Sequence, residues 1–128
     1  MRLALRDAHL RPEDIGYINA HGTATLKGDE AEAAAIRSVF GAEIPPVSST
    51  KGATGHMMGA GGITELIACV KALETGLLPP NLGFTAADEA CPLPLVTEPG
   101  RETKLKAAMS NAFGFGGQNS SLIVGRAE

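Results

Sequence analysis

Three short segments carry the side chains that could take part in a reaction. They read HGTATLKGDE at residues 21–30, SSTKGATGH at 48–56 and SNAFGFGGQNSS at 110–121. The first contains His21, the second contains Lys51 and His56, and the third is rich in glycine. Neutral imidazole and ammonium groups donate hydrogen bonds, which can stabilise negative charge that develops on an oxygen atom. These residue types therefore indicate chemistry at a thioester or another carbonyl group.

Each of these segments starts where a predicted strand ends, or joins two strands. Buried strands are predicted at residues 15–20 and 47–50, with a glycine loop at 51–55 after the second. Two further strands, at 107–112 and 120–125, flank the turn FGFGG. Ligands of open α/β sheets bind at the edge where the strands end. We therefore expect His21, Lys51 and His56 to meet at one edge of a sheet.

Three helices are predicted between the strands, at residues 2–9, at 30–40, and from 56 or 57 to 75. Asp29 is a favourable N-cap for the second helix, and Gly41 and Gly76 follow the ends of the second and third. Apolar residues at helical spacing predict buried faces, formed by Ala33, Ile36, Val39 and Phe40 and by Ile63, Leu66, Ile67, Val70 and Leu73. Residues 77–104 are predicted to be irregular because they are rich in proline. The order β-α-β-α-β-β predicts one α/β layered domain over residues 1–128.

The predicted place of His56, at a helix N-terminus beside Lys51, bears on its charge. Both the positive end of a helix dipole and a nearby ammonium group disfavour the imidazolium form. A neutral imidazole can donate a hydrogen bond to an oxyanion or enolate without losing its proton. Removing one such donor typically costs about 2.7–4 kcal/mol of transition-state stabilisation.

Other interpretations of these residues remain open at this point. Taken alone, His21 could be a structural loop histidine, and Lys51 could be a solvated loop lysine. The run GATGHMMGAGG suggests a phosphate loop, but it matches neither GxxxxGK[ST] nor a well-placed GxGxxG. The chain has no HExxH, CxxC or GxSxG, which disfavours a zinc hydrolase and a nucleophile elbow. The residues by themselves indicate an α/β domain with a two-histidine, one-lysine carbonyl site.

Composition excludes several other classes of protein. The net charge of -3 and the lack of a basic block disfavour nucleic acid and anionic membranes as partners. No apolar run is long enough to span a bilayer, and the first residues lack the apolar region of a signal peptide, so we expect a cytoplasmic location. Cys69 and Cys91 show no metal-type spacing and are expected to be free thiols, with a disulfide as the minor alternative. No metal site is predicted.

The motifs HGTAT, TKGATGH and NAFGFGG together resemble the ketosynthase family of the thiolase superfamily, over about Gly16 to Val124. The resemblance implies the C-terminal half of a thiolase-like layered fold, a mixed sheet packed with helices. It implies part of a β-ketoacyl-acyl-carrier-protein synthase, an acyltransferase that condenses malonyl-acyl carrier protein with an acyl thioester in fatty-acid biosynthesis. The implied partners are acyl carrier protein, whose phosphopantetheine arm carries the substrate without a further cofactor, the N-terminal half of the enzyme, and a second copy in a homodimer.

The resemblance also implies roles for individual residues. His21 and His56 would donate hydrogen bonds to the malonyl thioester carbonyl, and Lys51 would organise the site and hydrogen-bond near the first histidine. The backbone N–H of Phe115 would form half of an oxyanion hole. Thr23 and Thr25 would contact the phosphopantetheine arm. Phe113 and Phe115, beside Gly114 and Gly116, would gate access to the acyl pocket. Asp29, Glu32 and Glu65 would give local support, and Glu65 would hold the glycine loop.

One departure from the family concerns the nucleophile. Ketosynthases form an acyl-enzyme on a cysteine that follows a strand in the N-terminal half. Cys69 is predicted to lie mid-helix on a packed face, where thiols are inert, and Cys91 lies in a proline-rich loop. We therefore expect this chain alone to be inactive in condensation. The alternatives are a non-catalytic partner subunit similar to a chain-length factor, and a ketosynthase domain of a polyketide synthase.

Overall fold

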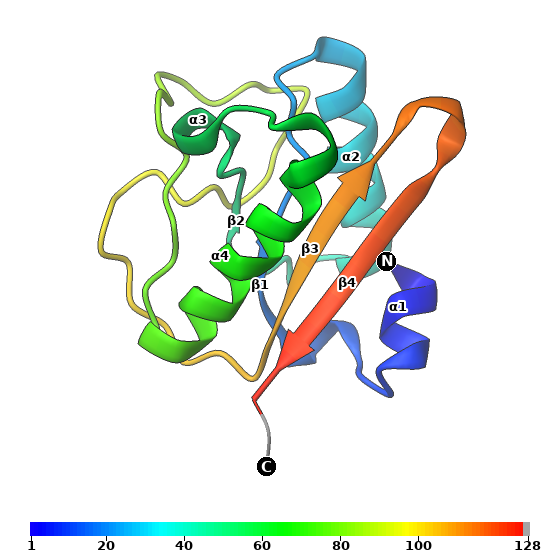
Figure 1. Ribbon diagram of the computed structural model, residues 1–128, viewed down its shortest axis with the longest axis vertical. Helices are drawn as coiled ribbons and strands as arrows, with labels where there is room; N and C mark the ends of the chain where they lie inside the picture. Colours follow the sequence, from blue (N-terminus) through cyan, green and yellow to red (C-terminus); the bar gives the residue numbers. More distant parts are fainter. Residues whose placement is uncertain (127–128) are drawn as a thin grey trace.

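The strands of the computed structural model, which describes residues 1–126, form one mixed sheet (Figure 1). The sheet has four strands in the order β2-β1-β3-β4. Strand β1 (Ile15–Asn19) pairs in parallel with β2 (Val47–Ser48) on one side and with β3 (Ala107–Phe113) on the other. Strand β4 (Asn119–Gly125) runs antiparallel to β3. The predicted α/β class, a mixed sheet packed with helices, is confirmed.

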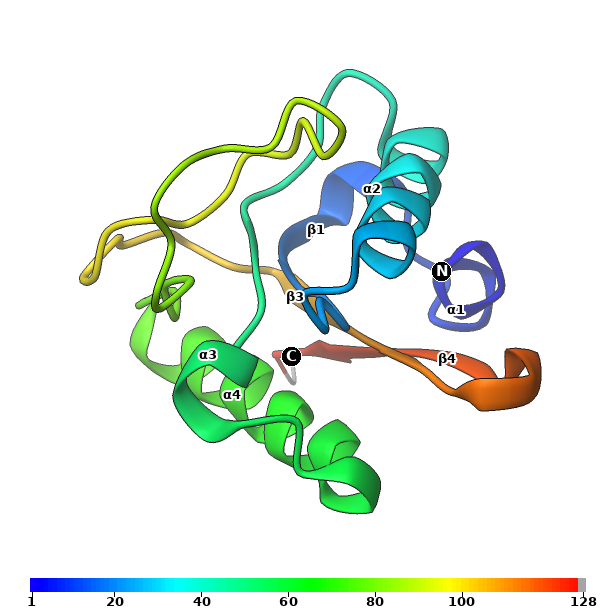
Figure 2. The same cartoon turned by 90° about the horizontal axis from the view of Figure 1, so that it is seen from above.

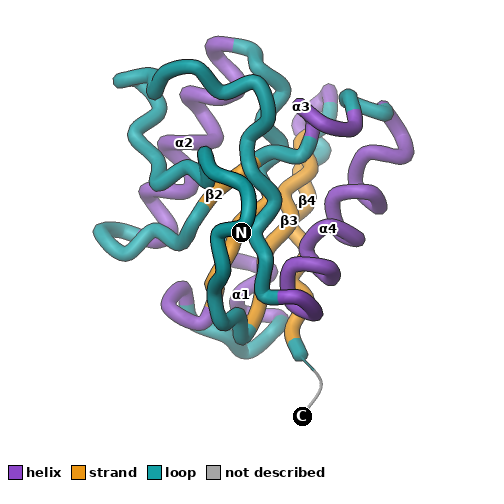
Figure 3. Tube along the Cα trace, turned by 90° about the vertical axis from the view of Figure 1, so that its left-hand side faces the viewer, coloured by secondary structure: helices purple, strands orange, loops and turns teal. Residues whose placement is uncertain are grey.

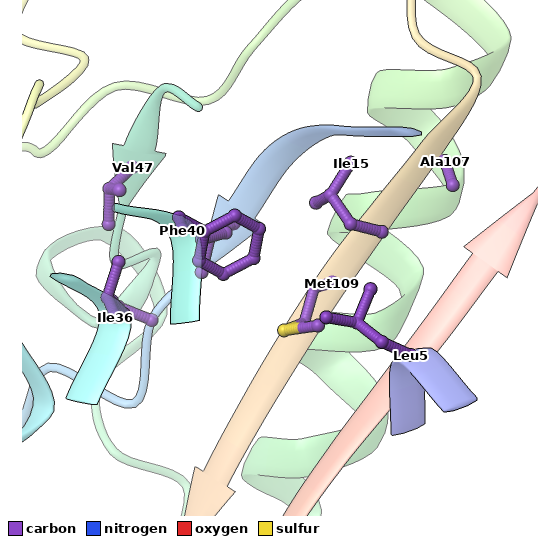
Figure 4. Close-up of a cluster of buried hydrophobic side chains, with 9 residues drawn as sticks. Leu5, Ile15, Ile36, Phe40, Val47, Ala107 and Met109 are labelled. Carbon is purple, nitrogen blue, oxygen red and sulfur yellow. The ribbon is translucent and has the colours of Figure 1, made fainter. Parts of the chain in front are cut away.

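Helices cover both faces of this sheet, as Figure 2 shows from above. Helices α1 (Arg2–Asp7) and α2 (Leu26–Phe40) lie on one face, and α4 (Gly61–Thr75) lies on the other. Because β1 is buried on both faces, its side chains are almost all buried and alternate between two cores. Ile18 packs into the α2-side core, which Figure 4 shows, and Tyr17 packs into the α4-side core. None of the helices within residues 1–126 combines the length and apolarity needed to cross a membrane.

Residues 77–104 contain no regular helix or strand but complete the β2 edge of the sheet (Figure 3). Leu95 bridges Val47 in parallel, and the backbone N–H of Val96 donates to the carbonyl of Val47 at 2.9 Å. This segment therefore fixes the strand that leads to Lys51.

The start of α2 differs from the prediction. The helix begins at Leu26 after Thr25, so Asp29 is not its N-cap. Asp29 lies in the first turn instead, where backbone amides of Ala24 and Thr23 bond to its carboxylate. The Asp29 carboxylate therefore bonds to the turn before the helix, although the residue itself lies within the first helical turn. The predicted end of the helix at Gly41 is confirmed.

The segment from Lys51 to Ala60 also differs from the prediction. Lys51–Thr54 forms a short helix, α3, in place of the predicted glycine loop. Met57 and Met58 have positive φ angles of 52° and 45°, which interrupt the helical conformation before α4 starts at Gly61. His56 therefore lies in a connecting loop, and its prediction at a helix N-terminus was wrong.

Helix α4 buries only part of the face that its apolar spacing predicted: Leu73 is buried as predicted and Leu66 is partly buried. Glu65 and Cys69 lie on the buried face, whereas Ile63, Ile67 and Val70 are 57%, 53% and 37% exposed. Glu65, Cys69 and Leu73 face the sheet, and the exposed side chains of Ile63, Ile67 and Val70 lie outside both cores. The spacing correctly identified an amphipathic helix, but it could not identify which layer covers the apolar side.

Replacing Gly52 by alanine is expected to destabilise the fold by about 1–3 kcal/mol, the usual cost of overpacking. A Cβ atom at Gly52 would overlap the carbonyl oxygen of Leu82, which is backbone and cannot rotate away. The matched control is Gly59→Ala, because nothing lies within 4 Å of a Cβ atom there. Urea unfolding would measure both changes, and equal effects of the two would contradict this packing argument.

Candidate active site

The turn that carries His21 is held by a buried carboxylate from α2. Glu32, which is 5% exposed, accepts hydrogen bonds from the backbone N–H groups of His21 and Gly22, both at 3.0 Å. It also accepts one from the Asn111 side chain of β3 at 3.1 Å. Burial raises the pKa of Glu32, and these hydrogen bonds partly offset that increase. The Glu32 carboxylate thus connects the turn that carries His21 to both α2 and β3.

The His21 ring faces two other rings at the edge of the sheet. Its centroid lies 5.7 Å from that of His56, with the planes perpendicular, and 5.7 Å from that of Phe113. Burial lowers the pKa of His21, and the nearby Lys51 and His56 lower it further. The structure therefore favours a neutral imidazole at His21, which can act as a hydrogen-bond donor at pH 7. The helix dipole invoked for His56 does not contribute, because His56 is not at a helix end.

Lys51 lies in a buried ion pair. Its ammonium group contacts the carboxylate of Glu65 from α4, and the two side chains are only 9% and 3% exposed. This geometry excludes the solvated loop lysine considered from the sequence. Glu65 therefore holds the segment predicted as a glycine loop through Lys51, and that segment folds as the short helix α3.

A hollow of about 650 Å³ opens beside these groups. Gly22, Thr23, Lys51 and His56 line one part of it, so side chains from two separate segments face a shared space. The far part is lined by apolar side chains from residues 82–95, namely Leu82, Phe84, Leu93 and Leu95. His56 therefore shares a hollow with an apolar wall, whereas His21 lies beside His56 and is not part of the lining.

The remaining predicted residues lie around this site. Thr23 lines the hollow and its hydroxyl is 3.3 Å from that of Thr25, which precedes α2. Phe113 is half-buried beside His21, whereas Phe115 is 99% exposed in the turn between β3 and β4. Gly114 and Gly116 flank Phe115 in this turn, and Gly116 has a φ of 76°.

Sequence reasoning missed three polar residues that support the site. Asn19, at the end of β1, is fully buried, and its amide nitrogen donates to the hydroxyl of Thr50 at 3.3 Å. Ser49 and Asn81 link the loops that follow β1 and β2, as described below. An asparagine at the end of an otherwise apolar strand was the available signal for Asn19, and no comparable pattern pointed to Asn81.

Neither cysteine has the properties of a nucleophile. Burial raises the pKa of the Cys69 thiol to about 12, and this side chain is fully buried on α4. Burial and nearby acidic side chains also raise the pKa of Cys91. Both are free thiols, as predicted. Within the part of the chain that the structure describes, no group of three or more His, Cys, Asp or Glu side chains could hold a metal ion.

We expect His21 to titrate below the ordinary histidine pKa of 6.5, and Lys51→Met to raise its pKa by removing a nearby positive charge. Because the folded-state pKa is lowered, the unfolded chain binds more protons below about pH 6.5. Folding stability should therefore fall as the pH drops from about 6.5 through the folded-state pKa. NMR titration of labelled histidines would measure this, with His9→Asn as the control. A His21 pKa at or above 6.5 would contradict the expectation.

Comparison with known proteins agrees with this geometry. Residues 1–85 match the family model described as "Beta-ketoacyl synthase, C-terminal domain". The chain is 46% identical over 128 residues to 3-oxoacyl-[acyl-carrier-protein] synthase 2 of Coxiella burnetii, covering 98% of this chain and 31% of that protein.

Solved structures give the same result. One is a ketosynthase in complex with its chain length factor from Xenorhabdus doucetiae, with a TM-score of 0.88 and 42% identity over 99% of this chain and 32% of that one. Another is a type II polyketide synthase acyl-carrier protein in complex with its ketosynthase, with a TM-score of 0.94 and 29% identity over 99% of this chain and 32% of that one.

These likenesses place the fold in the thiolase-like class to which ketosynthases belong. The chain belongs to the β-ketoacyl synthase family, in which it corresponds to the C-terminal domain. It spans about a third of the length of the relatives that it matches. The resemblance inferred from the three motifs is thus confirmed.

Proposed function

We propose that the full-length protein is a 3-oxoacyl-acyl-carrier-protein synthase of fatty-acid biosynthesis, and that this chain supplies its decarboxylation site. The observation that carries the proposal is the perpendicular pair His21 and His56, 5.7 Å apart, next to the buried Lys51, with His56 and Lys51 lining a hollow. Two imidazole donors beside a cavity suit a thioester whose oxygen gains charge during the reaction.

The donors act when the malonyl group loses carbon dioxide. The bond between the α-carbon and the carboxylate breaks, and its electron pair forms an enolate whose charge resides on the thioester oxygen. Hydrogen bonds from His21 and His56 stabilise this charge more than that of the neutral carbonyl, which lowers the barrier. The enolate carbon then attacks the acyl thioester, the carbon–sulfur bond breaks, and the enzyme cysteine leaves as a thiolate.

Other residues of the site would assist binding and acyl transfer. The backbone N–H of Phe115 would donate to the oxygen of the acyl thioester, and Phe113 and Phe115 would gate the acyl pocket on a turn made mobile by Gly114 and Gly116. Thr23 and Thr25 would contact the phosphopantetheine arm, which carries the substrate in place of a separate cofactor. Lys51 would keep His21 uncharged, and Asp29, Glu32 and Glu65 would support the loops.

The proposed partners are acyl carrier protein, the N-terminal half of the enzyme and a second copy of the protein in a homodimer. A solved ketosynthase with acyl-carrier protein bound, similar to this chain, supports the first. The exposed stripe of Ile63, Ile67 and Val70 on α4 supports coverage by further protein. The chain also exposes 7652 Å², whereas a monomer of 13.1 kDa is expected to expose about 6,400 Å². We keep the cytoplasm as the proposed location.

A non-catalytic partner subunit and a polyketide ketosynthase are the alternatives. The likeness to a ketosynthase solved with its chain length factor supports the first, and the likeness to a polyketide ketosynthase supports the second. The His21, Lys51 and His56 constellation favours a catalytic subunit, because a subunit without chemistry has no need of paired donors.

Decarboxylation of malonyl-acyl carrier protein by the full-length protein tests the proposal. Release of carbon dioxide that depends on His21 and His56, followed by condensation with an acyl group, is the expected result. Release that needs a second, different subunit would support the partner interpretation. Wild-type rates in the His21→Ala and His56→Ala variants would contradict the assignment.

A further inference from the structure

The site depends on two turns that follow different strands, and one side chain contacts both. Ser49 lies between β2 and α3. Its hydroxyl donates to the backbone carbonyl of Gly22 at 3.2 Å, in the turn that carries His21. The same hydroxyl oxygen accepts from the backbone N–H of Lys51 at 3.4 Å. Ser49 is thus a direct link between the His21 turn and the Lys51 helix.

Asn81 fixes Ser49 in turn. Its side-chain oxygen accepts from the backbone N–H of Ser49 at 2.8 Å. Its amide nitrogen donates to the carbonyls of Val47 and Val96, at 3.3 and 3.2 Å. One half-buried side chain therefore satisfies backbone groups on both β2 and the loop that pairs with it. Loss of the Asn81 side chain would leave the backbone N–H of Ser49 without its partner, which is costly, whereas the carbonyls of Val47 and Val96 keep backbone donors.

Close backbone approach tightens the same link. A Cβ atom at Gly22 would lie 2.7 Å from the Cβ of Ser49, so only glycine lets the His21 turn close on Ser49. On the other side, Gly52 packs against the carbonyl of Leu82, the residue after Asn81. The three segments thus meet around Ser49 with little space for rearrangement.

We propose that Ser49 and Asn81 are positioning residues that set the separation of His21 from Lys51. This inference rests on the proposed function, because the separation matters only if both groups serve one reaction. Neither residue needs to touch substrate. They act through the backbone of the two turns, so they govern how strongly the Lys51 charge keeps His21 neutral and where the His21 donor points.

Ser49→Ala in the full-length protein tests the proposal, with Ser38→Ala as the matched control. The Ser38 hydroxyl also makes a hydrogen bond, but to Arg2 on the exposed surface far from the site. We expect Ser49→Ala to lower kcat for malonyl decarboxylation about tenfold with KM within about twofold, less than the roughly 100-fold cost of a 1 Å misplacement. We expect the pKa of His21, followed by NMR, to rise toward its ordinary value. Ser38→Ala should change neither.

Several results would overturn the proposal. An unchanged kcat with an unchanged His21 titration would do so, and so would a change in KM alone, which indicates substrate contact. Should Ser49→Ala melt below the assay temperature, Ser49→Cys keeps the size and weakens the hydrogen bonds, and the same two readouts decide. If wild-type protein does not decarboxylate malonyl thioesters, the proposed function fails, and the His21 titration alone decides whether Ser49 sets the separation.

Discussion

Replacing His56 or His21 by alanine in the full-length protein should slow malonyl decarboxylation by about 100- to 1,000-fold, the usual effect of removing one donor to a developing oxyanion. The two rings lie 5.7 Å apart at the edge of the sheet, and His56 lines the adjacent hollow, so each is expected to donate to the same oxygen. Loss of either leaves the charge on the enolate half-stabilised. Substrate KM should change far less than kcat, because the donors act mainly on the transition state.

The third histidine of the chain is the natural control. His9 is exposed, follows α1 and has a φ of 52°, a conformation that asparagine tolerates well. His9→Asn should therefore retain wild-type decarboxylation. Rates would be measured as carbon dioxide released from malonyl-acyl carrier protein. An equal loss of rate in His9→Asn and His56→Ala would indicate a general effect on folding and would contradict the donor roles.

Glu65→Gln should lower the free energy of unfolding by about 3–5 kcal/mol, because it leaves the buried Lys51 ammonium without its partner. The control is Glu74→Gln, which breaks the exposed Lys71–Glu74 pair on the same helix, with side chains 67% and 56% exposed. That change should cost no more than about 1 kcal/mol. Urea unfolding would measure both.

The double variant Lys51→Met with Glu65→Leu separates charge from packing. Replacing both partners of a buried ion pair by apolar residues is often close to neutral for stability. We expect the double variant to recover most of the stability lost in Glu65→Gln while its decarboxylation stays impaired. An effect of Glu65→Gln no larger than that of Glu74→Gln would show that the Lys51–Glu65 pair does not hold the site.

Much of the site geometry was predictable because strand ends converge on one sheet edge. The apolar run at Ile15 marked the buried central strand, and the histidine that follows it had to lie at the edge. Lys51 and His56 are only five residues apart in the sequence, so both had to lie near the end of the second strand. The FGFGG turn between β3 and β4 was likewise predictable, because its glycines lie between two strand-like runs.

Other features depend on contacts that local sequence does not show. Met57 and Met58 adopt positive φ angles although neither is glycine, so the late start of α4 carried no local signal. Asp29 had two competing uses, as an N-cap and as a partner for the preceding amides, and propensity alone could not decide between them. Ile67 is 53% exposed, and its helical spacing is the same whether the side chain faces the sheet or points away from it.

The most direct measurement is a crystal structure of the full-length protein with a malonyl thioester analogue that cannot lose carbon dioxide. We expect the thioester oxygen to lie about 3 Å from a ring nitrogen of both His21 and His56, with the Lys51 ammonium still on Glu65. An analogue whose thioester oxygen contacts neither imidazole, or a site in which the two rings point away from it, would contradict the proposed donor roles.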